Sequence, residues 1–137
     1  MKFSTSLLYV KNVVKSLDFY TQAFDLKVKF LHDTKSYGEI ATGSTRLCFA
    51  HHSLIESNFA DTKIKGLTLS NIANKPLSIE IGLEIDENKV IHYYEKAQKF
   101  GATSIAKPNL KPWGQLVAYL QDLDGYLISL GSNDYQT

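Results

Sequence analysis

The sequence predicts an α+β fold in which two β-α-β-β-β modules pair around a common interior. Three observations support this fold class. The chain has 137 residues, of which 44% are hydrophobic and 21% charged, as in one ordinary folded domain. Its expected strands and helices occur in the same order twice, with a period of about 70 residues. Each half alone is too small to bury a stable core, so we expect one domain over residues 1–137 with a cleft between curved sheets.

The first half shows one strand, one helix and three further strands. Residues 6–10 are apolar and β-prone, and Asn12 is a plausible helix cap. The apolar positions that follow have helical spacings of four, three and four: Val13, Leu17, Tyr20 and Phe24. Polar residues and a Gly-Ser turn then separate three short strands, at 27–32, 37–42 and 45–51.

The second half repeats this order. Residues 79–85 alternate strictly between apolar and polar or small side chains, which indicates a strand with one polar face that carries Glu80. Asp86 is expected to cap a helix that ends near Gly101. Three strands follow, at 103–107, 115–121 and 126–131. We therefore expect module 1 at about 1–52, a polar connection over 53–76 and module 2 at about 77–137.

Charge and cysteine content exclude several classes of protein. The formal net charge is +1, so no broad positive field attracts nucleic acid or an anionic membrane. The only cysteine, Cys48, has no partner for a disulfide or a zinc motif. No apolar stretch approaches the roughly 18 residues of a membrane-spanning helix. We expect a soluble, cytoplasmic protein with no nucleic-acid or membrane partner.

Three segments resemble the vicinal oxygen chelate superfamily, which contains glyoxalase I, bleomycin-resistance proteins, fosfomycin-resistance enzymes and extradiol dioxygenases. They are YVKNVVKSLDFYTQAFDLKV (9–28), YGEIATGSTRLCFA (37–50) and PWGQLVAYLQDLDGYLISL (112–130). The resemblance implies paired βαβββ modules that form half-open barrels, with one helix per module on the outer side, and a homodimer that often exchanges modules.

Metal-dependent members of this superfamily hold a divalent ion with four side chains from the inner strands. The resemblance places Thr5, Cys48, Glu80 and Ser129 at these four positions. Only Glu80 is an ordinary ligand for such ions, which take about six oxygen or nitrogen ligands. We therefore expect a dismantled metal site and no cofactor, with an ion held weakly through Glu80 as the alternative.

Several residues have both a functional and a structural interpretation. Glu80 is expected to project into the cleft, as a general base or partner of a cationic ligand, or else as a solvated or ion-paired carboxylate. Cys48 is either a nucleophile whose pKa is lowered by nearby Arg46, or a thiol that fills core space. Four aromatic residues either wall a ligand cavity or pack in the core: Tyr9, Tyr37, Trp113 and Tyr119.

Three functions remain open at this point. The first is metal-independent binding of a small, partly aromatic molecule, as in the drug-sequestering bleomycin-resistance proteins, with Tyr9, Tyr37, Arg46, Cys48, Trp113 and Tyr119 as ligand contacts. The second is a glyoxalase-like lyase, isomerase or dioxygenase-type enzyme that acts on a small oxygenated substrate through Glu80. The third is an interaction domain whose cavity is filled by side chains. We favour the first, because the expected metal ligands are missing.

Overall fold

The computed structural model describes residues 1–54 and 79–132. These residues form two compact units, one from the first range and one from the second. The expected connection at 53–76 lies almost wholly outside the described residues. Within them, no helix is both long and apolar enough to cross a membrane.

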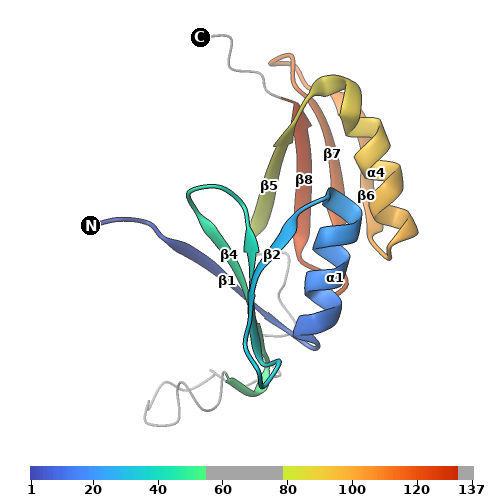
Figure 1. Ribbon diagram of the computed structural model, residues 1–137. Coiled ribbons are helices and arrows are strands. Elements are labelled where there is room, and N and C mark those ends of the chain that lie inside the picture. The colour runs from blue at the N-terminus through green and yellow to red at the C-terminus, as the bar shows by residue number, and fades with distance from the viewer. Residues whose placement is uncertain (55–78, 133–137) are drawn as a thin grey trace, which may run out of the picture. The chain divides into compact units, whose positions relative to one another are not determined.

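The first unit is a four-stranded sheet covered on one face by a helix. The strands lie in the order β1-β4-β3-β2, with β1 parallel to β4 and the other neighbours antiparallel. The helix α1 packs against β3 and β4 (Figure 1). The elements in chain order are β1 (Thr5–Val10), α1 (Val13–Phe24), β2 (Lys27–Leu31), β3 (Tyr37–Ala41) and β4 (Arg46–His51).

The amphipathic pattern of α1 accounts for this packing. Asn12 caps the helix as expected, because its side chain accepts a hydrogen bond from the Lys15 amide at 3.0 Å. Tyr20 is fully buried, and its ring lies 5.1 Å from that of Phe49 on β4. Gly38 on β3 allows the close approach, since a Cβ atom there would lie 2.7 Å from Leu17 Cδ1.

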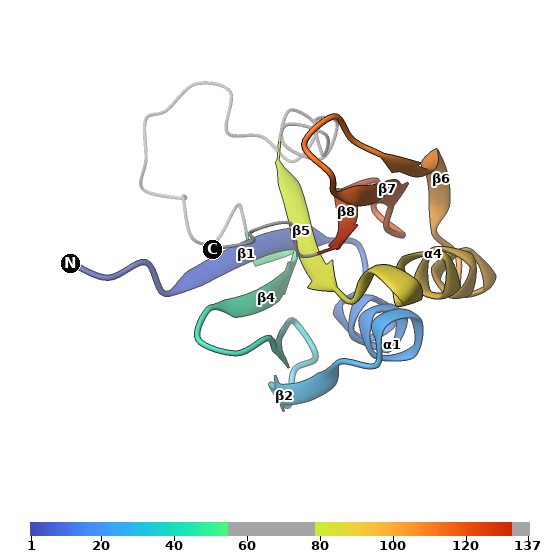
Figure 2. The same cartoon turned by 90° about the horizontal axis from the view of Figure 1, so that it is seen from above.

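The second unit has the same topology as the first. Its strands lie in the order β5-β8-β7-β6, with β5 parallel to β8. The helix α4 packs against one face of this sheet, along β6, β7 and β8 (Figure 2). The elements are β5 (Glu80–Ile85), the 3₁₀ turn η2 (Glu87–Lys89), α4 (Val90–Lys99), β6 (Thr103–Leu110), β7 (Leu116–Gln121) and β8 (Leu127–Ser132). The predicted α+β class and the two β-α-β-β-β modules are therefore confirmed.

Two details of the second unit differ from the expectation. Asp86 makes no side-chain cap, because its carboxylate pairs with Lys89 Nζ at 2.8 Å and a 3₁₀ turn precedes α4. The strand β6 runs three residues beyond the expected end at 107, through Pro108 to Leu110. A bulge between Ala106 and Asn109 in its pairing with β7 accommodates this proline, which has no amide hydrogen to donate.

Candidate functional site

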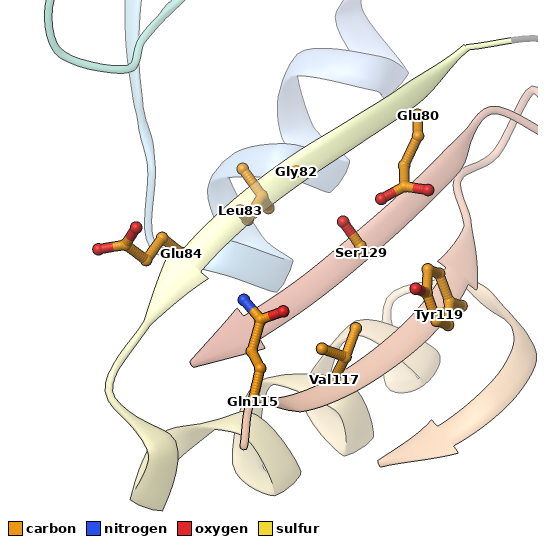
Figure 3. Close-up of a pocket in the computed structure, with 9 residues that line it drawn as sticks. Glu80, Gly82, Leu83, Glu84, Gln115, Val117, Tyr119 and Ser129 are labelled. Atoms are coloured by element: carbon orange, nitrogen blue, oxygen red, sulfur yellow. The ribbon is translucent and has the colours of Figure 1, made fainter. Parts of the chain in front are cut away.

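A pocket of about 250 Å³ lies on the sheet of the second unit. Three strands and the loop before β7 supply its lining (Figure 3). The lining residues are Glu80, Gly82, Leu83, Glu84, Gln115, Val117, Tyr119, Ser129 and Gly131. Two of these nine are carboxylates and none is basic.

The strand register brings these side chains together. Alternate residues of a strand project to the same face, so Glu80, Gly82 and Glu84 share one side of β5. Gly82 pairs with Ser129 on β8, and Ser129 pairs in turn with Tyr119 on β7. Figure 3 shows the two glutamates toward opposite ends of β5, with Ser129 between them on the neighbouring strand.

Three polar groups of the pocket are available to a ligand. Ser129 is only 9% exposed, yet none of the described residues forms a hydrogen bond with its hydroxyl. Glu80 and Glu84 are exposed, and neither forms an ion pair with any described residue. No buried side-chain N or O atom of the described residues lacks a hydrogen-bond partner, so the Ser129 hydroxyl is reachable by solvent from the pocket.

The far end of the pocket is held by the loop between β6 and β7. Gln115 donates to the Ser132 carbonyl at 2.8 Å and accepts from the Trp113 indole at 3.1 Å. Gly131 leaves room for this amide, because a Cβ atom there would lie 2.8 Å from Gln115 Nε2. The ammonium of Lys111 lies 5.2 Å above the centre of the Tyr119 ring, a cation–π contact. These contacts fix the orientation of two lining residues.

The first unit contains a hydrogen-bonded cluster on the face of its sheet opposite α1. Glu39 on β3 accepts hydrogen bonds from the Tyr37 hydroxyl at 2.8 Å and from the Arg46 guanidinium at 3.2 Å. Arg46 also donates to the Thr5 hydroxyl at 2.8 Å. Glu39 is 8% exposed and was not predicted as a site residue. Its position two residues after Tyr37, and therefore on the same strand face, was the available signal.

Cys48 adjoins this cluster and is fully buried. Burial raises the pKa of the Tyr37 phenol, and its hydrogen bonds to Cys48 and Glu39 raise that pKa further. Tyr37 therefore stays protonated at neutral pH and donates to Glu39. The Cys48 thiol therefore has no solvent-exposed surface.

Comparison with known proteins identifies the family. The sequence profile of the glyoxalase-like domain matches residues 3–133. The chain belongs to the glyoxalase-like domain family. The structures that resemble this glyoxalase-like chain include members of the glyoxalase/bleomycin resistance/dioxygenase superfamily, and with the family match they confirm the predicted vicinal oxygen chelate assignment.

Two solved structures illustrate the similarity. A glyoxalase-related enzyme from Fulvimarina pelagi has a TM-score of 0.80 at 16% identity, over 97% of this chain and 88% of that chain. A glyoxalase/bleomycin resistance protein/dioxygenase family enzyme from Burkholderia phytofirmans PsJN has a TM-score of 0.77 at 17% identity, over 96% of this chain and 98% of that chain. At such identities the likeness concerns the fold alone. No curated protein matches the sequence.

Of the four positions implied for a metal, Thr5 and Cys48 belong to the first unit, and Glu80 and Ser129 belong to the second. The Thr5 hydroxyl accepts a hydrogen bond from the Arg46 guanidinium, whose positive charge disfavours a second cation beside it. Cys48 is a buried thiol next to Tyr37, and Ser129 offers only a neutral hydroxyl. Glu80 is the one carboxylate among the four. Over residues 1–54 and 79–132, no three His, Cys, Asp or Glu side chains gather in a group that could hold a metal ion.

The other predicted ligand contacts lie in different places. Tyr119 lines the pocket, whereas Trp113 is 61% exposed and reaches it only through Gln115. Tyr9, on β1, is half-buried in the first unit. Tyr37, Arg46 and Cys48 belong to the first-unit cluster. Glu84, which was not predicted, also lines the pocket, toward the other end of β5 from Glu80, and the period of two in β5 was the signal that could have identified it.

Proposed function

We propose that this protein binds a small organic molecule without a metal ion, as a glyoxalase-like binding protein similar to the drug-sequestering members of its superfamily. The observation that carries the proposal is the pocket of about 250 Å³, which Glu80, Glu84 and Ser129 line and toward which the Glu80 carboxylate points (Figure 3). Small-molecule sites commonly combine an apolar wall with a few polar anchors, and Tyr119 and Val117 provide that wall here.

Metal independence is supported by the chemistry of the implied ligand positions. Arg46 donates to Thr5, so a fixed guanidinium lies at the first of them. Glu39 accepts from the same guanidinium, which favours a structural ion pair over a cation site. We propose a homodimer with no nucleic-acid or membrane partner, in the cytoplasm, on the basis of the superfamily resemblance and the near-neutral charge.

Metal content and metal affinity test the proposal. Purified protein is analysed for bound metals and titrated calorimetrically with nickel, zinc, manganese and ferrous ions. The wild type and Glu80→Ala are both expected to show no stoichiometric binding. One-to-one binding that disappears in Glu80→Ala would overturn metal independence and favour a lyase or dioxygenase.

A second candidate function is catalysis by Glu80 as a general base. The observation in its favour is the position of Glu80 in the pocket, on the same lining as the Ser129 and Tyr119 hydroxyls. The test is proton NMR of small hydroxycarbonyl compounds incubated with wild type and with Glu80→Gln. Conversion by the wild type alone would establish catalysis, and unchanged substrates in both samples would favour pure binding.

A further inference from the structure

We propose that Lys107 and Pro108 form an edge block on β6, which keeps this strand from pairing with β6 of a second copy of the chain. The strand is the last of the second sheet, in the order β5-β8-β7-β6, and Figure 2 shows it at the edge of that sheet. Backbone groups on the outer side of an edge strand can pair with a strand of another chain. The inference goes beyond the proposed binding function and does not depend on it.

The length and exposure of β6 favour association with another strand. With eight residues it is the longest strand in the part of the chain that the structure describes. Seven of these eight residues are exposed, and they include two apolar side chains, Ile105 and Leu110, which are 50% and 61% exposed. A long, exposed edge strand with apolar side chains tends to aggregate unless its sequence opposes pairing.

The path of β6 is interrupted at the edge block. Its register with β7 shifts twice, between Ser104 and Ala106 and between Ala106 and Asn109, and the second shift contains Lys107 and Pro108. The strand at the other end of the same sheet, β5, pairs with β8 without a shift. Bulges bend and twist a strand, so a second copy of β6 cannot follow this edge as a regular ladder.

Pro108 removes a hydrogen-bond donor from the outer edge of the sheet. A proline has no amide hydrogen, and within sheets it occurs on edge strands with its nitrogen toward solvent, or at bulges. Residues 103–106 precede the edge block and residues 109–110 follow it. Each of these two runs is shorter than an ordinary strand of about five to six residues.

Lys107 adds an electrostatic obstacle at the same place. Its side chain is exposed and lies near the middle of β6. An antiparallel pair of two copies would therefore bring both ammonium groups close to the two-fold axis between them, where like charges repel. Lysine on an edge strand is a common means by which proteins avoid edge-to-edge pairing. The homodimer proposed above therefore forms through a surface other than β6.

Sedimentation equilibrium of the full chain tests the inference with the double variant Lys107→Thr/Pro108→Val. Both new residues favour strands, and both have an amide hydrogen. At high protein concentration we expect the weight-average mass of this variant to be about twice that of the wild type, because one two-fold contact is added. The matched control Lys99→Thr/Pro112→Val removes one lysine and one proline from exposed positions outside β6, and it should keep the wild-type mass.

Two further measurements locate the added contact. Ile105→Lys, introduced into the double variant, returns a charge to the edge and should restore the wild-type mass. Hydrogen–deuterium exchange should be slower over residues 103–110 in the double variant than in the wild type at the same concentration, because strand pairing protects backbone amides. Circular dichroism verifies that each variant is folded.

Three results would overturn the inference. They are a wild-type mass in the double variant, an equal increase in mass in the control, and an increase in mass without slower exchange over residues 103–110. If the double variant does not fold, the single variants Lys107→Thr and Pro108→Ala take its place. Each should then have a higher mass than the wild type at high concentration, and a wild-type mass in both would overturn the inference.

Discussion

Replacement of Arg46 by methionine tests whether the first-unit cluster stabilises the fold. Methionine keeps much of the side-chain length but removes the hydrogen bonds to Glu39 at 3.2 Å and to Thr5 at 2.8 Å. Among residues 1–54 and 79–132, Glu39 would then retain only the Tyr37 hydroxyl as a partner. A hydrogen bond to a charged group contributes about 1.5–3 kcal/mol. Because the Arg46 side chain is 44% exposed, solvent screens the pair, and we expect a loss of about 1.5 kcal/mol in unfolding free energy.

Urea unfolding followed by circular dichroism measures this loss. The matched variants are Glu39→Gln and the double variant Glu39→Gln/Arg46→Met, which together isolate the pairwise energy in a double-mutant cycle. We expect a coupling energy of about 1 kcal/mol. In Glu39→Gln a neutral amide replaces the carboxylate, so the loss of Arg46 no longer leaves a buried charge without its partner. Additive losses, with a coupling energy within about 0.3 kcal/mol of zero, would refute the reasoning. They would mean that the Arg46–Glu39 pair does not stabilise the fold.

Two further predictions concern the same unit. Gly38→Ala should destabilise the protein by about 1–3 kcal/mol in urea unfolding, since its Cβ would lie 2.7 Å from Leu17 Cδ1. As a control in the second unit, Gly82→Ala should stay within about 0.5 kcal/mol of wild type, because its Cβ would make an ordinary contact. The raised pKa of Tyr37 means that the folded protein keeps the phenol proton at a pH where the unfolded chain, with a phenol pKa of about 10, has lost it. The contribution of Tyr37 to the free energy of unfolding is therefore full below about pH 10 and is lost as the pH rises above it. Between pH 9 and 11, at about 25 °C, Tyr37→Phe should therefore lose less unfolding free energy than the wild type. An equal loss in the two proteins would contradict the assignment of this pH dependence to Tyr37.

The periodicity of the sequence was sufficient to predict most elements. The expected helix after Asn12 begins at Val13 and ends at Phe24, because its cap and its apolar spacing both follow from local sequence. The strict alternation in 79–85 predicted β5, because this pattern also follows from local sequence. Among the strands, β6 differs most from its expected range, because a bulge, which depends on pairing with β7, allows it to continue past 107 to Leu110.

The pocket was harder to predict, because it depends on register between strands. The position of Glu80 on the polar face of β5 followed from alternation, but the pairing of Gly82 with Ser129 and of Ser129 with Tyr119 did not. Trp113 was predicted to line a ligand cavity, but its indole donates a hydrogen bond to the Gln115 side chain. Side-chain hydrogen bonds of this kind are set by tertiary geometry, and the sequence contains no periodic signal for them.

The most direct test of the proposed function is a fragment screen by two-dimensional amide NMR on ¹⁵N-labelled protein in the presence of EDTA. Binding without a metal ion predicts saturable shifts that centre on Gly82, Tyr119, Ser129 and Gly131. Shifts that require an added divalent ion, or that centre on residues outside this pocket, would contradict the account.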